Sequence, residues 1–234
     1  FNEQQVVSGL SLVLWGVFQK VVIADRLALL VNQVYDSPSE YQGLTILVAT
    51  YFFWFQIYCD FAGYTSIARG VARVFGFDLV KNFNRPYLSK DFNEFWNRWH
   101  ISLSNWLRDY IFFPIMRVFR RRWPKGNIIT NLLLPSLLTL LISGLWHGSG
   151  WNFVVWGILH GIILFVSAWT KPWRGRIFSQ EKWKRLAFFA DFFQILITFN
   201  MVSFAWIFFR AENLNIAILI LKRLLVIEKL NISL

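Results

Sequence analysis

Three histidines are the side chains of this sequence best suited to acid–base chemistry. His147 is the most informative, because it follows a long apolar run and lies between glycines in residues 144–151. Glycine lets the backbone bend and lets small groups approach the imidazole. An ionisable side chain deep in an apolar segment is costly, so a functional role is the default hypothesis: a buried neutral imidazole can accept a proton from a hydroxyl. The alternative is a histidine that only hydrogen-bonds a backbone carbonyl.

The other two histidines have weaker claims. His100 borders the apolar face of a predicted helix, one turn from Trp96 and one turn from Ser104, where a packing role is the simpler interpretation. His160 lies on a second apolar segment. No carboxylate or cysteine stands at ligand spacing from the histidines, which argues against a zinc site. The sequence lacks the glycine-flanked serine of hydrolases and the P-loop of ATPases, so neither class has support.

Several charged side chains have structural interpretations. Glu94 and Arg98 have the i,i+4 spacing of a helix pair, and Arg108 with Asp109 is expected on a solvated or interfacial face. Asp60 is either a polar anchor inside a helix bundle or a charge at a helix end, and the sequence leaves both open.

The helix expected to carry His100 runs through residues 91–113 as one amphipathic element. Asp91, three residues before Glu94, predicts a helix start of the capping-box kind, and Pro114 predicts its end or a kink. The helix lies either at the membrane interface or within a ring of protein helices. Its large apolar residues recur at helical spacing; they are Phe92, Phe95, Trp96, Trp99, Leu103, Trp106, Leu107 and Tyr110.

Apolar segments of spanning or near-spanning length surround this helix. Residues 6–18 are too short to cross a bilayer unless they are tilted, re-entrant or continued by residues 21–31, which would place Asp25 and Arg26 where charge is usually paired. The other expected spans are residues 44–61, 128–145, 151–169 and 186–209.

The segments between the spans are polar or basic. Basic runs at residues 117–125 and 171–185 bracket the His147 hairpin and predict cytoplasmic loops. Residues 36–40 predict a loop, residues 69–85 do not have the pattern of a lipid-facing segment, and residues 213–227 predict a short amphipathic tail.

Composition agrees with a membrane protein. Of 234 residues, 56% are hydrophobic and 16% are charged, against about 25% charged in soluble domains. In a soluble protein, the net charge of +11 would suggest nucleic-acid binding. Cytoplasmic loops of membrane proteins carry the same excess of basic residues, so no nucleic-acid partner is expected. One cysteine, Cys59, forbids an intrachain disulfide. We therefore predict an all-α, multi-spanning membrane protein.

The ordered motifs resemble the membrane-bound O-acyltransferase (MBOAT) family, and within it the alginate O-acetyltransferase branch. The resemblance covers nearly the whole chain. The motifs that carry it are QIYCDFAGYT at 56–65, NFNRPY at 82–87, EFWNRWHISLSNWLRDY at 94–110, GLWHG at 144–148, WGILHG at 156–161 and FFRA at 208–211.

The resemblance implies a fold and an activity. It implies one membrane-embedded domain over residues 1–234, with a ring of helices around a tunnel where an acyl group passes from a thioester to a hydroxyl. His147 matches the expected catalytic residue, and His100 matches a second histidine of the same tunnel. The further residues expected along the substrate path are Trp96, Trp99, Ser104, Trp146, Asn152 and Asp60.

The resemblance also implies reactants and a location. We expect no tightly bound cofactor or metal, and a donor that is acetyl-CoA or an acylated carrier protein with a phosphopantetheine arm. The acceptor would be an exported polysaccharide such as alginate, reached directly or through an acyltransferase partner outside the membrane. The expected location is the bacterial cytoplasmic (inner) membrane, among its lipids.

Departures and rival hypotheses remain at this stage. Asn97 stands where arginine is commoner in the branch, Ser66 stands where aspartate is frequent, and residues 113–117 replace the usual Pro-Leu-Gly-Gly. Family members are about twice as long, so we expect a C-terminal part of a longer protein. D-alanyl transfer to teichoic acid and peptidoglycan O-acetylation would use the same histidines. A transporter or flippase, or an inactive remnant that binds a partner, are the alternatives from other classes.

Overall fold

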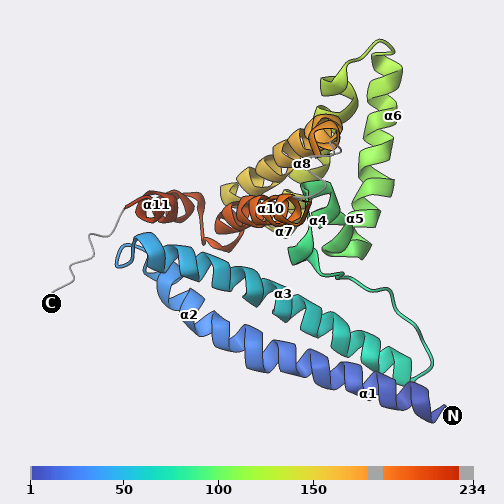
Figure 1. Cartoon of the computed structure of the whole chain (residues 1–234), viewed down its shortest axis with the longest axis vertical. Helices are drawn as coiled ribbons and strands as arrows, with labels where there is room; N and C mark the ends of the chain where they lie inside the picture. The colour runs from blue at the N-terminus through green and yellow to red at the C-terminus, as the bar shows by residue number, and fades with distance from the viewer. Residues whose placement is uncertain (1, 179–186, 227–234) are drawn as a thin grey trace. The chain divides into compact units, whose positions relative to one another are not determined.

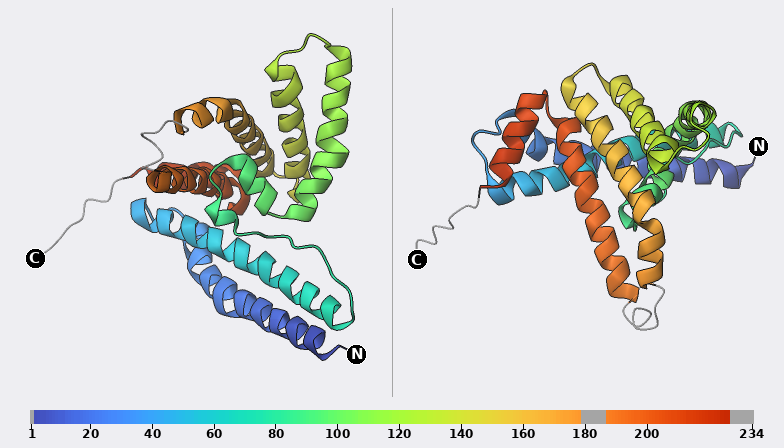
Figure 2. Two further views of the ribbon diagram at one scale, coloured as in Figure 1. Left: turned by 45° about the vertical axis from the view of Figure 1, so that its right-hand side comes forward. Right: turned by 90° about the horizontal axis from the view of Figure 1, so that it is seen from above.

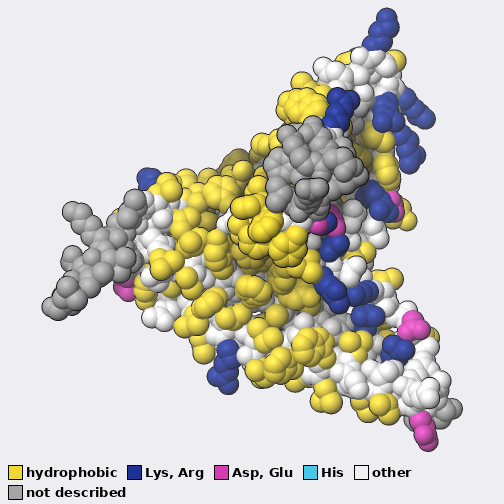
Figure 3. Space-filling view, viewed as in Figure 1, with side chains coloured by type: hydrophobic (Ala, Val, Ile, Leu, Met, Phe, Trp, Pro, Cys, Tyr) yellow, Lys and Arg dark blue, Asp and Glu magenta, His cyan; other side chains and the backbone are white. Residues whose placement is uncertain are grey.

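The computed structural model describes residues 2–178 and 187–226, and each regular element in these ranges is a helix (Figure 1). Hydrophobic side chains cover much of the visible surface, as helices in contact with lipid require (Figure 3). The structure therefore confirms an all-α, multi-span membrane protein. Within the described ranges, the helical stretches long and apolar enough to cross a membrane are Glu3–Asp36, Gly43–Val74, Ile129–His147, Trp151–Arg176 and Phe188–Arg210.

The chain divides into two compact units. The first contains residues 1–81 and 206–234, and the second contains residues 82–205. The single domain expected over residues 1–234 stays a prediction.

In the first unit, three consecutive helical elements form one stretch. They are α1 (Glu3–Val17), the π-helical η1 (Phe18–Ala24) and α2 (Asp25–Asp36). The short apolar segment at 6–18 is thus continued by residues 21–31, as one of the alternatives predicted. A loop follows at residues 37–40, as expected, before α3 (Gly43–Val74), which extends well beyond its predicted end at residue 61.

Glycines let α3 pack closely against α1 beyond residue 61. The helices α1 and α3 run antiparallel and side by side (Figures 1 and 2). They touch where Gly9 faces Gly70 and Gly16 faces Gly63; a Cβ at Gly16 would lie 2.8 Å from the side chain of Ile67. Small residues let helix backbones approach closely in a membrane, and this contact extends past the predicted end of α3.

An ion-pair cluster joins η1, α2 and α3 near the middle of their spans. The Lys20 Nζ lies 2.9 Å from Asp25 Oδ1 and 2.7 Å from Asp60 Oδ1. The expected pairing of Asp25 is therefore present. Asp60 is in the middle of α3, so the helix-end alternative is wrong. Its side chain is half exposed, and it links α3 to η1 through Lys20. Asp60 belongs to the first unit, and its place in a substrate tunnel stays a prediction.

The C-terminal part of the first unit is short and amphipathic, as predicted. Helix α11 (Leu214–Leu224) packs against α3, and the side chain of Asn213 caps it by accepting a hydrogen bond from Ile216 N at 3.0 Å. Residue 227, the predicted end of this tail, lies outside the described residues.

The second unit carries the three histidines. Its helix α10 (Ala187–Arg210) continues into residues of the first unit, and residue 186, where this span was expected to begin, lies outside the described ranges. The other elements, in chain order, are η2 (Pro86–Leu88), α4 (Phe92–Arg98), α5 (Ile101–Leu107), the π-helical η3 (Arg108–Phe112), α6 (Phe113–Arg122), the π-helical η4 (Ile129–Leu133), α7 (Leu134–His147) and α8 (Trp151–Phe178).

The α7–α8 hairpin confirms the predicted pair of spans and the turn at residues 148–150. Glycines again set the approach of the two helices. A Cβ at Gly157 would lie 3.0 Å from the carbonyl carbon of Leu140, and a Cβ at Gly161 would lie 2.9 Å from the Cα of Leu137. The four-residue spacing of these glycines places both on the face of α8 that contacts α7.

The prediction of one helix over residues 91–113 was wrong, because the helix is broken at Trp99 and His100. Of the two alternatives for Pro114, the helix end is wrong, because helix α6 continues past it to Arg122, and the kink stays a prediction. Proline lacks an N–H and crowds the preceding turn, and the turns before Pro114 and Pro135 are both π-helical.

Within the described residues, much of both basic runs lies on helices. Exposed arginines of residues 117–122 are on α6, where Figure 3 shows basic side chains gathered. Helix α8 continues to Phe178, so the prediction of a loop was wrong over residues 171–178. Residues 179–185 lie outside the described ranges.

Candidate functional site

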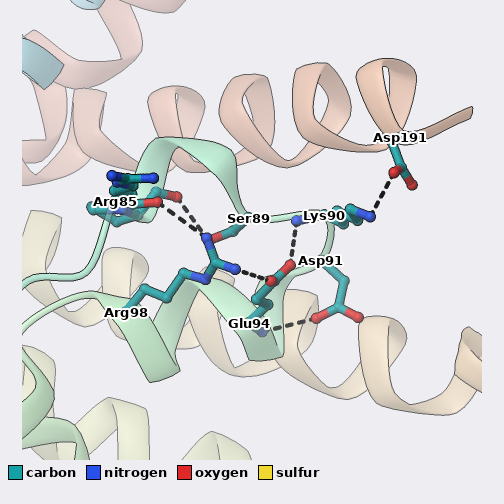
Figure 4. Close-up of polar contacts among 8 residues, drawn as sticks. Arg85, Ser89, Lys90, Asp91, Glu94, Arg98 and Asp191 are labelled. Atoms are coloured by element: carbon teal, nitrogen blue, oxygen red, sulfur yellow. Dashed lines mark hydrogen bonds and ion pairs between the residues drawn. The ribbon is translucent and has the colours of Figure 1, made fainter. Parts of the chain in front are cut away.

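Helix α4 begins in a polar network that fixes it against two spans. The Asp91 side chain accepts a hydrogen bond from Glu94 N at 2.8 Å, which confirms the predicted helix start. Asp91 also lies 3.6 Å from Arg174 of α8, and Lys90 Nζ lies 2.6 Å from Asp191 of α10 (Figure 4). The Glu94–Arg98 pair, also drawn there, confirms the i,i+4 prediction. The network holds the helix that leads to His100.

His100 sits at a strained point of the backbone. Its φ of 42° and ψ of 55° are left-handed, a conformation that residues with a Cβ rarely adopt. Helix α4 ends just before it and α5 begins just after it, so His100 is not on the predicted continuous face with Trp96 and Ser104. The Ser104 hydroxyl instead donates to the carbonyl of Trp99 at 2.9 Å. Strained residues persist only where their surroundings hold them, and they concentrate at functional sites.

His147 is the last residue of α7, next to the glycine-bounded turn that the sequence indicated. Its ring centroid lies 4.8 Å from that of Trp146 and 5.3 Å from that of Trp156. A Cβ on Gly148 would collide with the ring of Phe153, so the turn requires glycine there. The imidazole is half-buried at the end of a helix rather than enclosed within it.

The two candidate histidines interact electrostatically. Burial, and to a smaller extent the charge that His147 would carry, lowers the pKa of His100 to about 4. The tertiary structure therefore brings together two imidazoles 47 positions apart in the chain. His100 is neutral at physiological pH, which is the state that can accept a hydrogen bond or a proton.

His160 has a stronger position than the sequence suggested. It is fully buried, with its ring centroid 4.4 Å from that of Trp156, 5.4 Å from that of Trp96 and 5.1 Å from that of Phe92. With Asn152 and Trp156, it forms a buried stripe at four-residue spacing on α8. That spacing was visible in the sequence and would have identified Trp156, which our prediction missed.

A cavity of about 220 Å³ lies between the α4–η3 segment and the α7–α8 hairpin. Its walls are mostly apolar, and Trp96, Ser104 and Ser136 are among its lining residues. Within the described residues, the buried Trp96 Nε1 and Ser136 Oγ have no hydrogen-bond partner. Buried polar atoms are costly to leave unpaired, so the cavity suits a ligand that offers both polar atoms and apolar length. Ser136 was not among the predicted residues.

The model of the membrane-bound O-acyltransferase family matches residues 4–209. The chain belongs to the membrane-bound O-acyltransferase family. This match includes the histidines and the helices that carry them.

Three relatives illustrate the similarity of this MBOAT chain. It is 37% identical over 224 residues to "Peptidoglycan O-acetyltransferase" of Helicobacter pylori, covering 94% of this chain and 39% of that protein. It is 37% identical over 203 residues to "Probable alginate O-acetylase AlgI" of Pseudomonas aeruginosa, covering 86% of this chain and 35% of that protein. It is 32% identical over 173 residues to "Teichoic acid D-alanyltransferase" of Streptococcus thermophilus, covering 69% of this chain and 42% of that protein. The chain spans about two fifths of the length of these relatives.

The predicted substrate-path residues occupy different environments in the MBOAT chain. Trp96 and Ser104 line the cavity, and Asn152 is buried beside the aromatic stripe. Trp99 is packed in the core against Phe95, while Trp146 is 66% exposed and is not among the residues that line this cavity. The structure thus associates Trp96 and Ser104 with an open space, and the roles of the others stay predictions.

Two further predictions concern charge and metals. Arg108 and Asp109 form a two-point ion pair, with Nε to Oδ1 at 2.8 Å, and both side chains are about half exposed, as expected on a solvated or interfacial face. Across residues 2–178 and 187–226, no three His, Cys, Asp or Glu side chains gather as a metal site would require.

Proposed function

We propose that the complete protein is a membrane O-acyltransferase that moves an acyl group, most simply acetyl, from a thioester to a hydroxyl of an exported or cell-wall polymer. The observation that carries the proposal is the pair of interacting imidazoles, His100 and His147, in a chain whose family matches over residues 4–209. The names of the relatives support a polymer acceptor, since they include acetyl transfer to peptidoglycan and alginate and D-alanyl transfer to teichoic acid.

His147 is assigned the role of general base. A neutral imidazole takes the proton of the acceptor hydroxyl as its oxygen attacks the acyl carbonyl carbon. The resulting tetrahedral intermediate collapses, the C–S bond breaks, and the thiolate leaves and is protonated by the imidazolium. Such proton transfer contributes typically 10² to 10⁴ in rate. His100, neutral for the reasons given above, orients or polarises a reactant.

The cavity is the proposed path of the donor. Along α7 and η4 its lining runs from Leu140 to Leu132, roughly 10 to 20 Å from His147 at the helical rise per residue. In this proposal, the donor enters on the side of the basic residues of α6 and its acyl end reaches beyond Leu140 toward His147. Trp96 Nε1 and Ser136 Oγ would pair with the amides of a phosphopantetheine arm, from acetyl-CoA or from an acylated carrier protein.

The acceptor and location follow from the same proposal. We place the protein in the bacterial cytoplasmic membrane, with the polymer acceptor, or an acyltransferase partner that completes the transfer, on the outer side. An alginate-like polysaccharide is the first candidate. Peptidoglycan is the second candidate, because the alignment with "Peptidoglycan O-acetyltransferase" covers 94% of this chain.

Substitution in the complete protein tests the assignment. His147→Ala should lower transfer of labelled acetyl from acetyl-CoA at least 100-fold, while Ser149→Ala, an exposed neighbour in the same turn, should not. Both variants are compared at equal amounts of folded, membrane-inserted protein. Retention of most activity by His147→Ala would show that His147 is not the base.

A further inference from the structure

The left-handed backbone of His100 is held by a segment outside its own helices. Ile101 N donates to the carbonyl of Asn82 at 3.0 Å, and Asn84 N donates to the carbonyl of Arg98 at 2.9 Å. These two hydrogen bonds bracket His100 in the chain. They satisfy backbone groups that the break between α4 and α5 releases from helical pairing.

The side chain of Asn82 adds a third contact. Its Oδ1 accepts a hydrogen bond from Ser102 N at 3.1 Å. Ser102 is in the first turn of α5, where backbone N–H groups lack helical partners and a side-chain oxygen usually caps them. His100 occupies the N-cap position, but its side chain makes no capping hydrogen bond. Asn82, which lies 20 positions before Ser102 in the chain, supplies the cap instead.

The segment that carries Asn82 is itself anchored. Phe83 is buried, and its ring meets the ring of Trp99 edge-on, with centroids 5.0 Å apart. Trp99 in turn stacks on Phe95 of α4, at 5.6 Å. The apolar anchor fixes Asn82 in register with the turn that it holds.

Energetics explain why the turn needs this support. A left-handed residue with a Cβ costs on the order of 1–2 kcal/mol, and the apolar pattern of residues 91–113 favours one uninterrupted helix. Loss of a side-chain cap costs about 1 kcal/mol more. Without the bonds from Asn82, local preference would move His100 toward the right-handed helical conformation and redirect its side chain.

We propose that Asn82 is a positioning residue for His100. Its carboxamide caps α5 and its carbonyl holds Ile101, and together they keep the His100 imidazole within electrostatic reach of His147. This inference rests on the proposed transfer through the two histidines. It adds a residue that acts through His100 rather than on the reactants.

The first test is a kinetic comparison in the complete protein. Asn82→Ala should lower kcat at least tenfold with the KM for the donor within twofold. Asn82→Asp should restore most of kcat, because a carboxylate oxygen can accept the same hydrogen bond from Ser102. The matched control is Asn213→Ala, which removes an equivalent asparagine cap from α11 and should leave kcat unchanged. Equal losses in all three variants would overturn the proposal.

The second test does not depend on activity. Diethyl pyrocarbonate modification of each histidine, followed by mass spectrometry, should show His100 reacting several-fold faster in Asn82→Ala than in the wild type, Asn82→Asp or Asn213→Ala. If Asn82→Ala does not fold, Asn82→Gln, which displaces the acceptor by one bond, should show an intermediate increase. An unchanged rate at His100 refutes the positioning role. A wild-type protein that transfers no acyl group refutes the proposed function instead, and the modification rates still decide the role of Asn82.

Discussion

The close contact between α7 and α8 predicts that single methyl groups will disturb His147 from a distance. Gly157→Ala would place a Cβ 3.0 Å from the Leu140 carbonyl carbon, and Gly161→Ala would place one 2.9 Å from the Leu137 Cα. Ordinary van der Waals contact begins near 3.4 Å, so the helices must separate by about 0.5 Å at Gly161 and by about 1 Å at Gly157, where the Leu140 carbonyl oxygen is the atom nearest to the added Cβ. Overpacking of this kind costs about 1–3 kcal/mol.

The displacement acts on the helix that ends at His147. A 1 Å misplacement of a catalytic group can cost about 100-fold. The predicted loss in kcat/KM is therefore about tenfold for Gly161→Ala, or about 1.4 kcal/mol, and approaches 100-fold for Gly157→Ala. Gly175→Ala is the matched control, since it lies on the same helix α8 and nothing stands within 4 Å of its added Cβ. Alanine there should stabilise the helix by up to about 1 kcal/mol.

The assay is acyl transfer by the complete protein, paired with thermal unfolding of the same preparations. Gly157→Ala and Gly161→Ala should lower both the unfolding temperature and kcat/KM, while Gly175→Ala lowers neither. If Gly157→Ala is as stable and as active as Gly175→Ala, the helices are not packed as closely as described and the reasoning fails.

Three further predictions concern the cavity, the ion pairs and pH. Ser136→Leu should raise the KM for the acyl donor about tenfold by filling the cavity, whereas Ser136→Ala should not. Equal KM values for the two variants in steady-state kinetics would contradict this prediction. Lys20→Met should destabilise the fold by leaving Asp25 and Asp60 without their cation, and the double variant with Asp60→Asn should recover part of the lost stability. Thermal unfolding of the two single variants and the double variant should give a coupling energy of about 0.5–3 kcal/mol, and strictly additive effects would refute the pairing. The pKa of His100 is about 4 when folded against 6.5 ordinarily, so the unfolded state binds more protons between these values and stability should fall as pH drops through that window. The loss of stability between pH 7 and pH 5 should be smaller in His100→Gln than in the wild type. If thermal unfolding shows the same loss in both proteins, the prediction is wrong.

The amino-acid sequence by itself determined the fold class, the hairpin around His147 and the family. Apolar runs long enough to cross a bilayer are a local property of composition, and the Asp91 cap depends on residues three positions apart. The π-helical turns before Pro114 and Pro135 also have a local cause, although we expected an end or a kink at Pro114. These features could be predicted because each follows from neighbouring residues.

The tertiary structure alone decided the break at His100. The pattern of residues 91–113 favours one helix, whereas hydrogen bonds between residues 82–84 and residues 98–102 satisfy backbone groups that the break at the left-handed His100 releases. The cavity beside Trp96 and the enclosure of His160 likewise depend on contacts between α4, α7 and α8. Contacts between distant segments leave no period in the sequence, and they can outweigh a local helical preference of about 1 kcal/mol.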